Sequence, residues 1–174
     1  MKKGQVWVET VIYVLIGLSI IGLVLAFVSP RIAEQKDRII IDQTIVSLRE
    51  FDSKINEVIE SGQDNRRIIE FGMKAGELYF DAVNNKIVFV LNGLEKPYSE
   101  SGIKVPVGRI IVESNEGKKT STVNLTLIYS NIDLTFQGTQ NIKKFNPSAV
   151  PYSFSIENKG TVSAGVTGID ISEG

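Results

Sequence analysis

Twenty consecutive residues near the start of the chain carry no charge. The segment 10–29 reads TVIYVLIGLSIIGLVLAFVS, and hydroxyls are its only polar side-chain groups. A helix of this length is about 30 Å long, which matches the hydrocarbon thickness of a bilayer. The pattern predicts a transmembrane helix, because the rest of the chain is too small to bury such a helix on every side.

A secretory signal that is cut off after the apolar run is the alternative interpretation of this segment. The run is longer than the apolar core of most such signals. Its far end offers Ala26-Phe27-Val28, which is a poor small-x-small cleavage site. The sequence therefore favours a segment that stays with the mature protein.

The helical pattern continues beyond the apolar run but becomes one-sided. Apolar residues recur at steps of three and four, with charged residues on the other faces, which is typical of an amphipathic helix. The stripe consists of Ile41, Ile45, Leu48, Phe51 or Asp52, Ile55, and Val58 or Ile59. Ser61-Gly62 follows as a stop signal, because glycine tolerates the left-handed conformation at a helix end.

Together the two patterns predict one long helix over 5–62. Its apolar half is 10–29 and its amphipathic half is 31–61. From Gln5 to Glu60 such a helix would be about 80 Å long. Pro30 falls between the halves and should kink the helix or loosen one turn there.

After Gly62 the hydrophobic period changes to two. Short strands are predicted at 67–71, 77–83, 86–91, 109–113, 120–129, 132–136, 152–156 and 166–171. Asn84-Asn85 predicts a tight hairpin between the second and third of these strands, and 114–117 predicts a turn. The expected fold class is α+β: the long N-terminal helix is followed by an antiparallel β-rich domain over 63–174, either a sheet or a small sandwich.

The composition narrows the possible chemistry. The chain has no cysteine and no histidine, and its 19 basic and 20 acidic residues nearly cancel. This removes disulfides, thiolate nucleophiles and Cys/His zinc sites, and it gives no basic surface for nucleic acid. We expect no catalytic residues, no cofactor site and no metal site, and hence a protein that is not an enzyme.

Two local features of the β-rich region bear on its function. Asn124-Leu125-Thr126 is a sequon for N-glycosylation, and Asn124 should face solvent because its neighbours on the strand face inward. The sequon favours an exported C-terminal domain, whereas the basic residues flanking the apolar run do not determine its orientation. Phe145, Tyr152 and Phe154 are expected to be core residues.

The first nine residues read MKKGQVWVE. Lys2-Lys3-Gly4-Gln5, with Glu9 four residues after the glutamine and an apolar helix behind it, resembles the class III signal peptide of archaeal type IV pilins. The long helix followed by a β-rich domain is similar to the pilin layout over the whole chain. Two residues depart from the pattern: Trp7 stands where a smaller residue is usual, and Tyr13 where an aliphatic residue is common.

The resemblance implies a specific life cycle. A membrane-bound prepilin peptidase would cut between Gly4 and Gln5, removing the leader 1–4. The subunit would then leave the membrane and join a helical surface filament, with the help of an assembly platform and its ATPase. The localisation expected is a single-pass membrane protein with its C-terminal domain outside, and then an extracellular filament; adhesion, motility, DNA uptake and secretion are all compatible with this layout.

Glu9 has a physical role in this interpretation. An ionised acid deep in a bilayer costs on the order of 2.5 to 3.5 kcal/mol, and less near the interface. The cut would create a positive amine at Gln5, four residues away on the same side of the helix. That amine, from the same or a neighbouring subunit, could pair with the carboxylate and set the axial register of assembly.

Other classes of protein are also compatible with the sequence. A single-pass membrane-anchored binding protein, whose β-rich domain captures a ligand or a surface, is the main alternative. An anchored enzyme is a third. In the simplest competing interpretation, Glu9 is only an interfacial charge beside a signal anchor.

Overall fold

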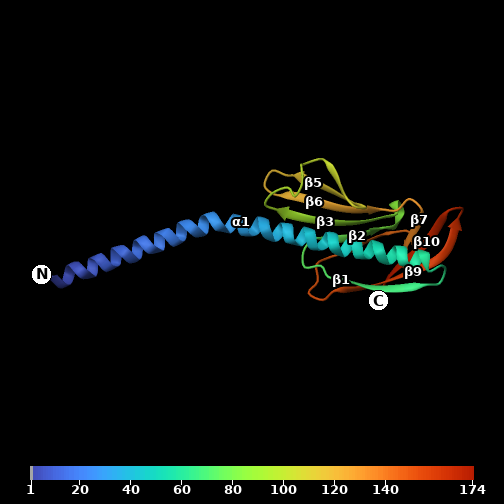
Figure 1. Ribbon diagram of the computed structural model, residues 1–174, viewed down its shortest axis with the longest axis horizontal. Helices are drawn as coiled ribbons and strands as arrows, with labels where there is room; N and C mark the ends of the chain where they lie inside the picture. Colours follow the sequence, from blue (N-terminus) through green and yellow to red (C-terminus); the bar gives the residue numbers. More distant parts are fainter. Residues whose placement is uncertain (1) are drawn as a thin grey trace.

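The computed structural model describes residues 2–174, and it describes the side chains of 7–29 and 31–174. One helix, α1 (Lys2–Glu60), is followed by strands that form two sheets. Figure 1 shows α1 projecting far beyond the sheets, with its second half packed against them. The predicted α+β class and the long N-terminal helix are therefore confirmed.

The helix runs through Pro30 without interruption. Its axis changes direction gently where the apolar half meets the amphipathic half (Figure 1). Proline has no N–H to donate, so the Ala26 carbonyl loses its usual partner, and such a loss typically bends a helix. The sequence placed the bend correctly, and it appears as a curve rather than a break.

Residues 66–173 form ten strands in two sheets. The four-stranded sheet has the order β1-β9-β10-β7, and the six-stranded sheet has the order β4-β5-β6-β3-β2-β8. The first consists of β1 (Arg66–Phe71), β9 (Tyr152–Ser163), β10 (Val166–Glu173) and β7 (Ile132–Phe136). The second consists of β4 (Lys104–Val107), β5 (Ile110–Glu116), β6 (Ser121–Ile128), β3 (Lys86–Leu94), β2 (Glu77–Asp81) and β8 (Ile142–Phe145).

Neighbouring strands are antiparallel except at one place. Strand β10 pairs with β7 in parallel, with Ile169 opposite Leu134. The predicted hairpin of β2 and β3 is present, and Asp81 is opposite Lys86. Its connection is a four-residue turn that contains the 3₁₀ helix η1 (Ala82–Asn84), and Asn85 closes the turn in a left-handed conformation.

The turn predicted at 114–117 is wrong. Strand β5 stays paired with β6 as far as Glu116, and the turn follows at 117–120. Ser114 is fully buried, and its hydroxyl accepts a hydrogen bond from the Ser99 amide at 3.0 Å. Tertiary burial of a serine therefore extends the strand through residues that favour turns locally.

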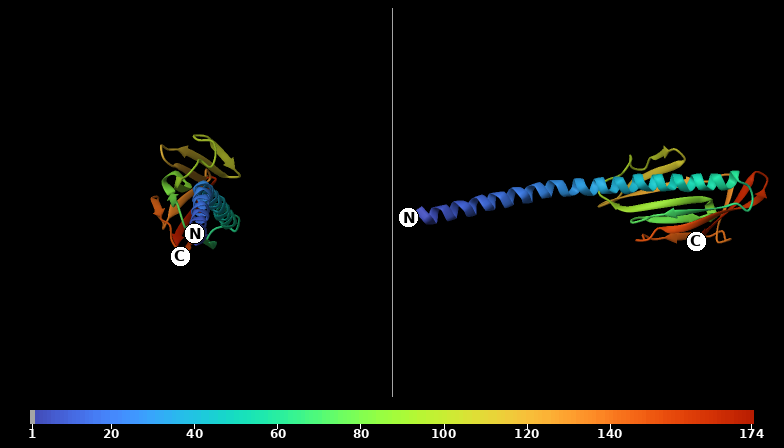
Figure 2. Two further views of the ribbon diagram at one scale, coloured as in Figure 1. Left: turned by 90° about the vertical axis from the view of Figure 1, so that its left-hand side faces the viewer. Right: turned by 60° about the horizontal axis from the view of Figure 1, so that its bottom comes forward.

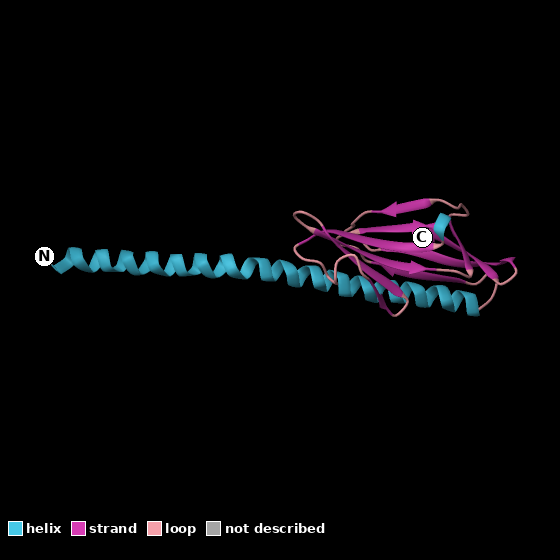
Figure 3. Cartoon of the chain, turned by 90° about the horizontal axis from the view of Figure 1, so that it is seen from above, coloured by secondary structure: helices cyan, strands magenta, loops and turns pink. Residues whose placement is uncertain are grey.

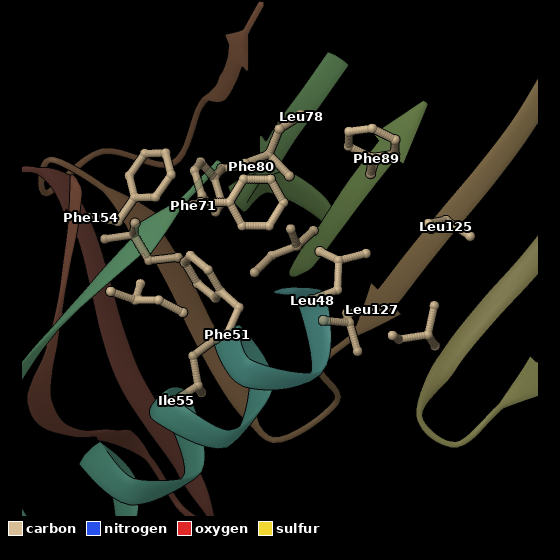
Figure 4. Packing of buried hydrophobic residues seen from close by; sticks show 14 of the residues in the cluster. Leu48, Phe51, Ile55, Phe71, Leu78, Phe80, Phe89, Leu125, Leu127 and Phe154 are labelled. Carbon is tan, nitrogen blue, oxygen red and sulfur yellow. The ribbon is translucent and has the colours of Figure 1, made fainter. Parts of the chain in front are cut away.

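The amphipathic half of α1 packs against both sheets and covers the apolar side chains between them. Figure 2 shows this arrangement along the helix axis, and Figure 3 shows α1 running beside the strands. Phe51 contacts one aromatic ring in each of three strands: its ring centroid lies 6.5 Å from that of Phe71 (β1), 5.5 Å from Phe80 (β2) and 6.0 Å from Phe154 (β9). Leu48 and Ile55 lie on either side of it (Figure 4).

Aromatic residues continue the core between the sheets. Phe80 packs at 5.7 Å against both Phe136 and Phe145, and Phe145 packs at 5.0 Å against Tyr152 and Phe154. Phe145 and Phe154 are buried, and Tyr152 is half-buried against the same cluster. The expectation that these three residues belong to the core is confirmed.

Candidate functional site: the exposed helix and its junction with the domain

The domain leaves the apolar half of α1 uncovered. The large apolar side chains between Trp7 and Val28 are between 38% and 74% exposed. By length and composition this helix is able to cross a membrane. An apolar surface of this extent needs a bilayer or other apolar helices around it.

The hydroxyls of two serines within the apolar half are satisfied inside the helix. Ser19 donates to the Leu15 carbonyl at 2.7 Å, and Ser29 donates to the Leu25 carbonyl at 2.8 Å. Bonds of this kind, to the carbonyl four residues earlier, let a hydroxyl lie in an apolar environment without an unpaired donor. These serines therefore do not oppose burial in lipid or in a helix bundle.

Glu9 lies on the exposed surface of the helix where the apolar half begins. No hydrogen bond or ion pair joins it to another described side chain. Gly4 and Gln5 lie in the first turns of α1, where the structure describes the backbone alone, and Met1 of the expected leader lies outside the described residues. The carboxylate is thus available to a partner from outside the described side chains.

Trp7 and Tyr13 are among the most exposed side chains, at 72% and 73%. Neither packs on the domain, so the core of this chain does not explain why they depart from the pilin pattern. Trp and Tyr are enriched where a membrane meets water. Trp7 stands where the apolar half begins, as an interfacial side chain would.

The loop between β3 and β4 joins the domain to α1 immediately beyond the apolar half. Lys96 pairs with Glu34 at 2.9 Å, and the Glu95 amide donates to Asp37 at 3.1 Å. The hydrogen bond from Lys96 is the largest cause that lowers the pKa of Glu34 below its usual range. These contacts hold the part of α1 just beyond the apolar half, at Glu34 and Asp37, against the domain.

Tyr98 extends the same junction. Its hydroxyl donates to Asp42 at 2.7 Å, and the Arg38 guanidinium lies 5.9 Å from its ring centroid. Burial, followed by the bond to Asp42, raises the pKa of Tyr98. A surface hollow lined by Ala26, Phe27, Arg31, Glu34, Glu95 and Lys96 shows that the loop reaches the last turn of the apolar half.

A polar cluster, in which Asp52 and Tyr129 are buried and Arg109 is exposed, holds the amphipathic half. Asp52 pairs with Arg109 at 3.0 Å and accepts a hydrogen bond from the Tyr129 hydroxyl at 3.1 Å. Arg109 also lies 5.3 Å from the centre of the Tyr129 ring. Burial, followed by the charge of Asp52, raises the pKa of Tyr129, so this hydroxyl remains a hydrogen-bond donor.

A second buried contact satisfies the end of the helix. The Asn158 side-chain amide, from β9, donates to the Val58 carbonyl at 3.1 Å. The last carbonyls of a helix have no partner within it, so a side chain from a strand supplies one here. Asn158 and Asp52 together fix how far along the domain the helix lies. Sequence reasoning missed both roles, because each partner is distant in the chain.

Asn124 lies in β6, between Glu113 of β5 and Val90 of β3. Its side chain is partly exposed, whereas Val123 and Leu125 are fully buried on the opposite face. The prediction that Asn124 lies on the strand face opposite Val123 and Leu125 is therefore confirmed. Glycosylation itself stays a prediction.

Two further hollows lie on the surface of the domain. One, of about 490 Å³, is lined by residues that include Arg109, Tyr129 and Asn131. The other, of about 280 Å³, lies between α1 and the segments 72–75 and 148–151. Among the described residues, no group of three or more acidic side chains is placed to hold a metal ion.

Comparisons with known proteins do not assign a family to the chain, so the features described above are interpreted from their chemistry alone. No protein-family model matches the chain, and neither a curated protein nor a solved structure matches it.

Proposed function

We propose that this protein is a pilin, a structural subunit of an archaeal type IV pilus-like surface filament. The apolar halves of many copies would form the core of the filament, and the β-rich domains would form its outer surface. The observation that carries the proposal is that α1 continues out of the domain with its apolar side chains 38% to 74% exposed. A membrane covers such a helix before assembly, and other copies cover it afterwards.

The order of residues along the helix supports the same proposal. The motif Lys2-Lys3-Gly4-Gln5 comes first, Glu9 follows, and the uncharged run begins directly after it. Prepilin peptidase would cut between Gly4 and Gln5 at the membrane surface. The new amine would lie one turn from Glu9, where an opposite charge lowers the cost of moving the carboxylate into an apolar bundle.

The junction with the domain supports a rigid subunit. Asp52 and Asn158 hold the amphipathic half, and Lys96 holds the turn just beyond the apolar half. A force on the apolar half, from the assembly platform and its ATPase, would therefore move the domain as well. A flexible linker between an anchor and a domain would not transmit motion in this way.

Negative-stain electron microscopy of surface material tests the proposal. We expect filaments that contain this protein, identified by peptide mass mapping and by labelling with an antibody to the β-rich domain. Cells without the gene should lack these filaments. A protein that stays in the membrane, in cells with no such filaments, would contradict the proposal.

The surface hollow of about 280 Å³ is the observation that favours the second candidate, a membrane-anchored binding protein. Its lining combines apolar Ile40, Met73 and Pro151 with the polar groups of Thr44 and Ser47. Ligand sites in proteins are commonly apolar hollows with a few polar groups, although they are usually somewhat larger. Extraction of the protein by detergent as a monomer, with no filaments on the cell, would favour this candidate.

A further inference from the structure

The amphipathic half of α1 has a second apolar face that its own domain does not cover. Ile32, Ile39 and Val46 are 51%, 52% and 61% exposed. They lie on the side of the helix opposite the buried stripe, which includes Leu48 and Ile55, at 100° per residue. We call Ile32, Ile39 and Val46 the outer seam.

The spacing of the outer seam continues through the apolar half. Positions seven residues apart are occupied by Val11, Leu18, Leu25, Ile32, Ile39 and Val46. Two helices that pack along their length with a left-handed twist use two apolar positions in every seven residues. The outer seam supplies one of these positions; the other is apolar in the apolar half, at Val14, Ile21 and Val28, and polar beyond it, at Gln35, Asp42 and Arg49. Packing of the helix on its own domain does not account for this repeat, because that packing uses the opposite face.

Lipid does not account for the outer seam either. The loop that contains Glu95 and Lys96 meets α1 at Glu34 and Asp37, and these charged groups mark where the apolar environment must end. Ile39 and Val46 lie ten and seventeen residues beyond Ser29, which places them about 15 Å and 25 Å farther along the helix. A bilayer that covers the apolar half ends before it reaches them.

A second copy of this chain has the surface that fits. We infer that the outer seam contacts α1 of a neighbouring copy, so that the contact between copies continues from the apolar half into the amphipathic half. The residues beside the seam carry both signs of charge, with Lys36 and Arg49 against Glu50, so opposite charges of two copies can pair. The identity of the partner rests on the proposed function; the requirement for a protein partner rests on the exposed seam.

Photo-crosslinking tests the inference directly. The chain has no cysteine, so Val46→Cys provides a single attachment point for a benzophenone maleimide. The control is Val83→Cys, because Val83 is 60% exposed and lies in η1, on the connection between β2 and β3. In the full-length protein in its native surface material, illumination should join labelled Val46 to α1 of a second copy, and several-fold less dimer should form from Val83.

Two results of this experiment would overturn the inference. One is capture of a different protein, or of lipid alone, by the label at Val46. The other is an equal yield of dimer from Val83, which would show that the crosslinks come from crowding.

A pair of charge substitutions provides a second readout. Val46→Glu places a carboxylate in the seam, and Val83→Glu places one at a surface of equal exposure. Both variants should fold and unfold like the wild type, because neither valine is buried. Val46→Glu should weaken association between copies at least about tenfold, or about 1.4 kcal/mol, and should reduce filaments, whereas Val83→Glu should not.

The outcomes separate this inference from the proposed function. Normal filaments from Val46→Glu would contradict the contact between the outer seam and a neighbouring copy, but would not contradict the pilin proposal. Crosslinked dimers from Val46 in a protein that never forms filaments would contradict the pilin proposal and leave the seam standing.

Discussion

Glu9 is the residue whose chemistry depends most on the proposed cleavage. It stands exposed at the beginning of the apolar half, with no partner among the described side chains. In the membrane it can remain near the interface, where its charge costs little. In a filament core it would be surrounded by apolar helices, and there it needs the amine that cleavage creates.

Glu9→Gln should therefore impair assembly more than membrane insertion. The substitution keeps the size of the side chain and removes the charge that would pair with the amine of Gln5. We expect the variant at normal levels in the membrane fraction and strongly reduced in filaments sheared from the cell surface. Glu60→Gln, at an exposed position on the same helix, is the control and should assemble. Normal filaments from Glu9→Gln would contradict the pairing.

The residue scale also shows what the sequence leaves undecided. The periodic stripe allowed either Phe51 or Asp52 to face the core, and the structure buries both, because the helix is covered from two sides by two sheets. The aromatic side chain fills the centre of the core, and the acid turns to Arg109 and Tyr129. No local pattern predicts an acid that is paired with residues more than fifty positions away.

Phe51→Ala tests the contact between helix and sheets. The ring is fully buried against three strands, so its removal should lower the free energy of unfolding by about 3 to 5 kcal/mol. Denaturant unfolding of the detergent-solubilised protein, followed by circular dichroism, measures the change. Glu50→Ala, beside it on the exposed face, should change the free energy by less than about 0.5 kcal/mol. Equal stability of the two variants would mean that the helix does not pack as described.

At the scale of elements, the sequence predicted the strands that have a strong period of two. It did not predict two short strands at the edges of the six-stranded sheet. The runs that became β2, β3, β6 and β7 alternate cleanly, and their inward residues are buried. Strand β4 contains Pro106 and lies at an edge, and β8 has two consecutive lysines. Both exist because a neighbouring strand offers unpaired backbone groups, and a pattern within one segment does not contain that information.

The turn between β2 and β3 is an element whose stability should depend on pH. Asp81 accepts hydrogen bonds from the Asn84 amide at 3.1 Å and from the Asn84 side chain, and it pairs with Lys86 at 3.2 Å. Burial opposes the charge of this carboxylate, but the bonds from Asn84 and Lys86 outweigh burial and hold the pKa of Asp81 below its usual range. A lowered folded pKa stabilises the fold above the unfolded value of about 3.9.

This contribution should be lost as the pH falls from about 4 through the lowered pKa of Asp81. The difference in free energy of unfolding between the wild type and Asp81→Asn should therefore shrink over that range, as measured by denaturant titrations at successive pH values. Glu116→Gln, at an exposed position, is the control and should follow the wild type. A constant difference between the wild type and Asp81→Asn would contradict the account of the turn.

At the scale of the whole molecule, one helix has two environments. The domain buries one stripe of its second half and leaves its first half, together with the outer seam, for other molecules. The sequence predicted the apolar half and the amphipathic half, whereas cleavage between Gly4 and Gln5 stays a prediction. It did not predict the junction through Lys96 and Tyr98, whose contacts with α1 join residues 62 and 56 positions apart.

The central claim is that this chain is cut and then assembled. Mass spectrometry of the intact protein, purified from the cell surface, tests that claim most directly. We predict a mature chain that begins at Gln5 and retains the whole apolar half. A protein that still begins at Met1, or one cut near Val28, would contradict the account.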